Sequence, residues 1–125
     1  MNDLAHKHVF SKGAEPQAQL VDQIEQLMRM IVEFLPVTSA QYPSLDTNGH
    51  EPIANFCVRH SALHFSKTAG QLAAIAEALD HGVNLQEANV RKIAVNSVIN
   101  SFKLASEVGL SPTELVHEIN LKFGQ

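Results

Sequence analysis

The sequence predicts an all-α protein, an antiparallel bundle of about four helices. Three observations lead to this fold class. Apolar side chains recur at spacings of three and four residues over long segments, prolines, glycines and capping residues bound these segments, and no segment alternates in the manner of a β-strand. Each predicted helix follows from this punctuation.

The first predicted helix begins near Pro16, a residue suited to the first helical turn, and ends at Pro36. Its apolar stripe comprises Leu20, Ile24, Leu27, Met28, Ile31, Phe34 and Leu35. A loop over residues 36–51 follows, with Tyr42 and Leu45 as its expected anchors. Because the loop is long, we expect it to be functional or packed across the bundle.

The second predicted helix runs from Pro52 to about Asp80. One continuous apolar stripe comprises Val58, Ala62, Phe65, Ala69, Leu72, Ala76 and Leu79. Further apolar side chains lie on its other sides, namely Phe56, Leu63, Ala73, Ala74 and Ile75. A helix that is apolar on more than one side is expected to be buried by more than one neighbour.

The third predicted helix runs from Leu85 to about Val108. Gly82 fits the left-handed cap of the preceding helix, and Asn84 with Glu87 is typical of a capping box. The short connection predicts that the second and third helices are antiparallel neighbours. The polar stripe of the third helix comprises Asn89, Lys92, Asn96, Asn100, Lys103 and Glu107.

A short fourth helix completes the predicted bundle. Gly109 repeats the glycine cap, Ser111 with Glu114 forms another capping-box pattern, and Pro112 occupies the first helical position. The apolar positions of this helix are Leu115, Val116, Ile119 and Phe123.

Composition excludes several classes of protein. The 125 residues predict a flexible N-terminal tail over 1–14 and one helical domain over 15–125. A net charge of −4 without a basic cluster predicts no nucleic-acid binding. No apolar run is long enough for a membrane span or a signal peptide, so we expect a soluble, cytoplasmic protein. The single cysteine, Cys57, excludes an internal disulfide and predicts a small buried side chain.

The second and third helices carry more apolar surface than two short partners can cover. An uncovered apolar face costs about 25 cal/mol per Å² left in water. We therefore predict a homodimer or higher oligomer. The alternative is that the loop and the tail cover this face.

Two sets of side chains have the spacing of metal ligands. His60 and His64 share one helix face, and Glu77 and Asp80 lie near His81 at the end of the same helix. The first pair needs a third ligand, for which Glu107 and His117 are candidates. The alternatives are histidines hydrogen-bonded to their neighbours and a solvated helix end. We favour these two alternatives over a metal site, so no cofactor is expected. Mg²⁺ is expected only if the metal site is rearranged.

A second candidate site is a groove between the second and third helices. Lys67, Lys92 and Lys103 can face the same groove, and Asn96 and Asn100 can line it. Ammonium and amide groups suit an anion such as a phosphate. The alternative is a solvated helix face.

Two segments resemble a known family. The segment HFSKTAGQLAAIAEALDHG, residues 64–82, is similar to the metal-binding helix of the MazG-like all-α nucleoside triphosphate pyrophosphatases. The segment RKIAVNSVINSFKLASEVGLSPTELVHEINLKF, residues 91–123, is similar to the next helix and the terminal helix of that family. The resemblance covers about half of the chain. It implies the family's helical fold.

The chain departs from the family where the family's chemistry lies. In the family, carboxylates of a Glu-Glu-x-x-Glu and a Glu-x-x-Asp motif hold Mg²⁺. Lys67, Thr68, Gln71, Ile93 and Asn96 occupy the five matching places here. None is a carboxylate, and Mg²⁺ needs several oxygen ligands at once.

The function expected from the sequence is therefore a MazG-like protein with a degenerate metal site. It would bind a nucleotide or small anionic ligand, or act in regulation, rather than carry out Mg²⁺-dependent hydrolysis. The ligand-binding candidates are Lys67, Thr68, Gln71, Lys92, Asn96 and Asn100. One alternative is an active nucleotide pyrophosphohydrolase with a rearranged site built from His60, His64, Glu77, Asp80 or Glu107. The other is a non-enzymatic, oligomeric protein-interaction module.

Overall fold

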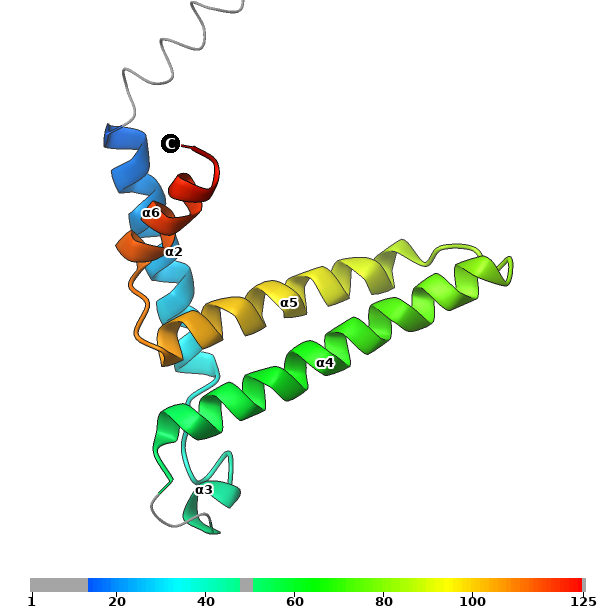
Figure 1. The fold of residues 1–125 in the computed structure, drawn as a ribbon, viewed down its shortest axis with the longest axis horizontal. Helices are drawn as coiled ribbons and strands as arrows, with labels where there is room; N and C mark the ends of the chain where they lie inside the picture. Colours follow the sequence, from blue (N-terminus) through cyan, green and yellow to red (C-terminus); the bar gives the residue numbers. More distant parts are fainter. Residues whose placement is uncertain (1–13, 48–50, 125) are drawn as a thin grey trace, which may run out of the picture.

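The protein is all-α over the residues that the structure, a computed structural model, describes: 14–47 and 51–124. The helices are α2 (Ala14–Phe34), α3 (Ser44–Thr47), α4 (Ile53–Asp80), α5 (Glu87–Glu107) and α6 (Pro112–Lys122) (Figure 1). No strand occurs within those two ranges, so the predicted fold class is confirmed there. Of the predicted tail, residues 1–13 lie outside the described residues, and the last, Ala14, begins α2.

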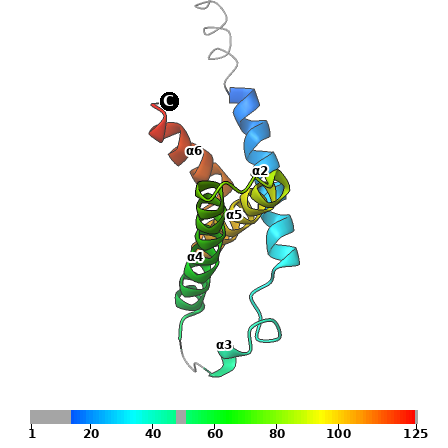
Figure 2. The same cartoon turned by 90° about the vertical axis from the view of Figure 1, so that its right-hand side faces the viewer.

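Helices α4 and α5 form a long antiparallel hairpin, as predicted (Figures 1 and 2). Gly82 ends α4 in the left-handed conformation, with a φ of +80°. The Val83 N–H donates to the Ala78 carbonyl at 2.9 Å, and the Gly82 N–H donates to the Leu79 carbonyl at 3.0 Å. These two bonds satisfy carbonyls that the helix end leaves free, and they reverse the chain.

The predicted start of α5 is wrong. The helix begins at Glu87 rather than Leu85, and its cap is Gln86, whose side chain makes no capping bond. Residues 83–86 have no regular structure, because they carry the chain across the end of the hairpin. Asn84 therefore lies outside the helix and forms no capping box with Glu87. Glu87 instead lies in the first turn, where its charge is favourable to the helix dipole.

The start of α6 agrees with the sequence in detail. Gly109 has a φ of +77°, and the Leu110 N–H donates to the Ala105 carbonyl at 2.9 Å. The Glu114 N–H then donates to Ser111 Oγ at 3.1 Å, and the Ser111 N–H donates to Glu114 Oε2 at 2.9 Å. This reciprocal pair is the predicted capping box.

Helix α2 packs across the end of the hairpin, where it contacts α5 and α6 (Figure 1). Asn120 Nδ2 on α6 donates to Gln17 Oε1 on α2 at 3.1 Å. The buried apolar side chains are Met28, Ile31, Phe56, Cys57, Ile93, Ala105 and Val116. This core is small for the number of apolar residues in the chain, so much apolar surface stays exposed.

The interface between α4 and α5 is more polar than the sequence predicts. Cys57, Ser61 and Thr68 are buried on α4. Ile93 and Lys103 are buried on α5, whereas the buried Ala105 lines the pocket among α2, α5 and α6. Along the apolar stripe of α4, by contrast, only Phe65 is half-buried and the other six members are exposed. Within one copy of the described chain, the expected burial of this stripe does not occur.

Candidate functional site

A cavity of about 310 Å³ lies between the middle of α4 and the first half of α5. It is lined by Gln71, Ala74, Ile75, Asn89, Lys92, Ile93 and Asn96. Three of the predicted ligand-binding residues, Gln71, Lys92 and Asn96, therefore meet at one place. All three side chains are exposed, so the cavity is an open groove. We call it the α4–α5 groove.

Helical spacing explains how the groove is built. Asn89, Lys92 and Asn96 are three and four residues apart, so they share one face of α5. Gln71 faces them from α4, and the buried Ile93 contributes an apolar wall. Asn89 was not among the site residues predicted from the sequence. Its position three residues before Lys92 on the same helix is the signal that could have identified it.

The lining groups determine what the groove can bind. Lys92 offers an ammonium group with three donors, and the three amides of Gln71, Asn89 and Asn96 offer both donors and acceptors. No carboxylate is among the described residues that line the groove. This donor set suits an anion with several oxygens, because the ammonium group supplies a positive charge and the ammonium and amide N–H groups can donate hydrogen bonds to those oxygens. It does not suit a hard cation such as Mg²⁺.

The other predicted ligand-binding residues lie elsewhere. Lys67 is exposed and Asn100 is half-buried, and neither lines the α4–α5 groove. Thr68 is buried, and its hydroxyl donates to the His64 carbonyl at 2.9 Å. This bond occupies the Thr68 hydroxyl within its own helix, so it is not offered to a ligand.

Lys103 belongs to a separate buried cluster at the other end of the hairpin. Its Nζ lies 3.0 Å from Glu107 Oε1, and both side chains are only 10% exposed. The same Nζ lies 5.4 Å from the ring centre of Tyr42. Burial lowers the pKa of Lys103, but the hydrogen bond and charge of Glu107, with a smaller effect of Tyr42, outweigh it and leave this pKa above its usual value. Lys103 is therefore a paired charge and not part of the groove.

Cys57 faces the same cluster. Its side chain is buried, with 3% exposure. Burial raises the pKa of the thiol, the charge and hydrogen bond of Glu107 raise it further, and Lys103 opposes them. The thiol therefore stays protonated at neutral pH, which makes it a poor nucleophile and metal ligand. The predicted role of a small buried side chain is confirmed.

The two histidines on α4 bond to each other. His60 Nε2 and His64 Nε2 are 2.9 Å apart, so one nitrogen donates and the other accepts. The His60 ring also contacts Tyr42, at 4.6 Å between ring centres, and stacks on Phe56 at 5.4 Å. Burial lowers the pKa of His60, as do the charges of His64 and Lys103, against an opposing effect of Glu107.

The four predicted metal ligands do not come together within one copy. Glu77 lies thirteen residues beyond His64 on the same helix, which is about 20 Å at about 1.5 Å per residue. In the described part of the chain, no group of three His, Cys, Asp or Glu side chains is placed to hold a metal ion. His81 Nε2 lies 4.0 Å from Glu77 Oε1, and both side chains are about three-quarters exposed, as in the alternative of a solvated helix end.

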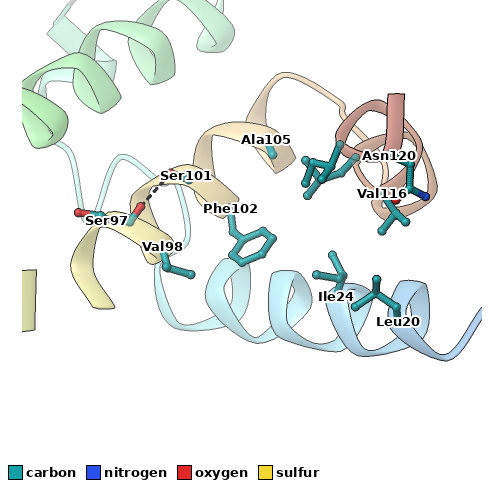
Figure 3. Close-up of a pocket in the computed structure, with 11 residues that line it drawn as sticks. Leu20, Ile24, Ser97, Val98, Ser101, Phe102, Ala105, Val116 and Asn120 are labelled. Carbon is teal, nitrogen blue, oxygen red and sulfur yellow. Dashed lines mark hydrogen bonds between the residues drawn. The ribbon is translucent and has the colours of Figure 1, made fainter. Parts of the chain in front are cut away.

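Two apolar pockets flank the contact of α2 with α5. The first, of about 520 Å³, lies among α2, α5 and α6, and Figure 3 shows Phe102 pointing from α5 toward α2 there. The second, of about 570 Å³, is lined by the C-terminal half of α2 and by α5. Val98 lines both pockets. Neither pocket carries a charged group among its described lining residues, so neither has the chemistry to hold an anion.

Comparison with protein-family models, with curated proteins and with solved structures finds no match for this chain. Among the helices that the structure describes, none has the length and apolar character needed to cross a membrane.

Proposed function

We propose that this chain is a MazG-like helical protein with a degenerate metal site, and that its α4–α5 groove binds a nucleotide or another small phosphate-bearing anion. In this proposal it binds or regulates and does not carry out Mg²⁺-dependent hydrolysis. The observation that carries the proposal is the composition of the groove. Gln71 and Asn96 stand at places where the resembling family has metal-binding carboxylates, and here they share a cavity with Lys92.

The charge balance of the groove supports an anionic ligand. In the family, Mg²⁺ neutralises the phosphates that the acidic site would otherwise repel. Here the amides of Gln71 and Asn96 remove the repulsion, and the ammonium of Lys92 supplies a positive charge directly. A volume of about 310 Å³ is at the small end of ligand pockets.

A second candidate function is a non-enzymatic, oligomeric protein-interaction module. It is favoured by the large apolar side chains that stay exposed along α4, including Val58, Leu72 and Leu79. The third candidate, a hydrolase with a rearranged site, has less support, since about 20 Å separates His64 from Glu77 along α4.

Ligand-dependent thermal stability tests the proposal. ATP, ADP and inorganic triphosphate, each with Mg²⁺ and with EDTA, are added to the full chain. We expect stabilisation by at least one of them in EDTA, since a ligand that binds only the folded state raises the melting temperature. No stabilisation by any would overturn the proposal, and so would Mg²⁺-dependent release of pyrophosphate.

Matched variants locate the site. Lys92→Gln removes a charge inside the groove, and Lys67→Gln removes the same charge outside it. A charged hydrogen bond is worth about 1.5–3 kcal/mol, so Lys92→Gln is expected to weaken binding by roughly 10- to 100-fold. Lys67→Gln is expected to leave affinity within about twofold, because an exposed charge outside the groove contributes little.

A further inference from the structure

The exposed stripe of α4 has the period of a coiled-coil seam. Large residues recur every seven positions at Val58, Phe65, Leu72 and Leu79. Alanines recur every seven positions between them, at Ala62, Ala69 and Ala76. The resulting alternation of four- and three-residue steps is the spacing at which two helices pack side chains into each other along their length. We call these seven residues the α4 seam.

The α4 seam is a free surface within one copy. Val58 is 51% exposed, Leu72 is 45% exposed and Leu79 is 44% exposed. Among the described helices, α5 alone runs alongside α4 (Figures 1 and 2), and it covers a different face. The buried residues Ser61 and Thr68 mark that face. Within the described chain, Phe65 is therefore the one half-buried member of the seam, and the other six are exposed.

The seam and the α4–α5 groove lie on adjoining sides of α4. At about 100° per residue, Gln71 lies about 100° from Leu72 around the helix, whereas Ile75, which also lines the groove, lies only about 60° from Leu72. A helix packed on the seam would therefore run beside the Ile75 edge of the groove. This inference goes beyond the proposed function and does not depend on it.

The seam is complementary to itself. When two copies of α4 run antiparallel, a small residue of one can face a large residue of the other between Ala62 and Leu79. The register that does this pairs Ala62 with Leu79, Ala69 with Leu72 and Ala76 with Phe65, each time between copies. Alanines let the two backbones approach closely, and the large residues fill the space opposite them.

Charge selects the same arrangement. The antiparallel register places Asp80 of one copy beside Arg59 of the other at both ends of the seam. In the structure Arg59 is exposed and already holds Glu51, so Asp80 adds a second acid to the same guanidinium. A parallel pairing would instead bring Asp80 level with Asp80 and Arg59 level with Arg59, so neither charge would have an opposite charge at its own level.

The N-terminal residues do not suit the seam as well. The segment 1–13 carries four large apolar side chains, Met1, Leu4, Val9 and Phe10. As a helix it would span about 20 Å, whereas the seam spans about 32 Å from Val58 to Leu79. A second copy matches the seam in length, in the positions of its large residues and in charge.

We propose that α4 pairs with α4 of a second copy of this chain, antiparallel, through the α4 seam. Light scattering on a size-exclusion column tests it. The wild-type chain is expected at twice the 13.7 kDa mass of one copy. Ala69→Glu places an acid from each copy near the centre of the pairing, and Ala76→Glu places one opposite Phe65. Each variant is expected to raise the dissociation constant at least 100-fold.

Leu63→Glu is the matched control. Leu63 is 64% exposed on the same helix but lies off the seam, so this variant is expected to stay dimeric. Circular dichroism checks that all the variants remain helical, which exposed glutamates in a helix permit. A monomeric wild type overturns the proposal, as does an oligomer that Ala69→Glu leaves intact. The proposal is also overturned if Val98→Glu, in the α2–α5 pockets, dissociates the oligomer and no seam variant does.

Spin labels test the direction of pairing. Cysteines are introduced at Ser66 or at His81, since native Cys57 is only 3% exposed and is protected from labelling. The antiparallel register puts the two copies of residue 66 about 16 Å apart and those of residue 81 about 33 Å apart. Similar short distances at both positions would mean parallel pairing and would overturn the proposed register.

Discussion

Lys103 and Glu107 lie one turn apart on α5 and form an ion pair, with 3.0 Å between Nζ and Oε1. Both side chains are nine-tenths buried, between the N-terminal part of α4 and the loop that carries Tyr42. Against the effect of burial, the hydrogen bond and the charge of Glu107 raise the pKa of Lys103, so each of the two buried charges depends on the other.

Removing one partner should therefore cost more than removing both. Lys103→Met leaves Glu107 buried and unpaired, and it is expected to lower the free energy of unfolding by about 3 kcal/mol. The double variant Lys103→Met, Glu107→Leu is expected to recover most of that loss. Chemical denaturation followed by circular dichroism measures both. A double variant as unstable as Lys103→Met would mean that the pair is not what couples these residues.

The stability of the fold should fall in mild acid because of His60. Its pKa in the folded chain is below the usual 6.5, so the unfolded chain takes up the proton first. The contribution of His60 is constant above about pH 7 and is lost as the pH falls from 6.5 toward the lowered value. His60→Gln is expected to flatten this slope in denaturation curves measured between pH 7.5 and 5. His117→Gln, on the exposed face of α6, is the control and should retain it.

Local signals predicted the helices better than their packing. Gly82, Gly109 and the Ser111–Glu114 box fixed helix ends, because caps depend on neighbours within a few residues. The same reasoning failed at Asn84, where the geometry of the hairpin end delayed the start of α5 by two residues. A capping pattern indicates where a helix can begin, but the residue at which it does begin also depends on the tertiary structure.

The spacing of polar residues on α5 predicted part of the groove. Lys92 and Asn96 lie on one face by helical geometry alone, and both line it. The same stripe continues to Lys103, which turned out to be buried against Glu107. A one-dimensional pattern does not tell a solvated charge from a paired, buried one. Nor did it show that the apolar stripe of α4 would face away from α5.

Substitution by alanine at Gly82, just after α4, and at Gly70, within α4, should change the stability of the chain in opposite directions. Gly82→Ala places a side chain where φ is +80°, and it is expected to destabilise the chain by about 1 kcal/mol. Gly70 lies within α4 with no atom within 4 Å of an added Cβ. Gly70→Ala is expected to stabilise the helix by about 0.5–1 kcal/mol. Thermal denaturation of both variants measures the difference, and equal effects would contradict this account of the turn.

Placing acids in the α4–α5 groove should create a divalent cation site. In the variant Gln71→Glu, Asn96→Asp, two carboxylates would face one cavity from opposite helices. Lys92→Gln is added to remove the charge that would repel a cation. Since Mg²⁺ and Mn²⁺ bind to carboxylate oxygens, millimolar Mn²⁺ is expected to raise the melting temperature of this triple variant by a few degrees. The wild type, with amides at both positions, is expected not to respond.

The single variants Gln71→Glu and Asn96→Asp, each with Lys92→Gln, separate a true site from surface binding. One carboxylate holds a divalent ion weakly, so each should respond less than half as much as the triple variant. An equal response from either would show that the two positions do not converge on one ion. It would also remove the main support for the proposed degenerate metal site.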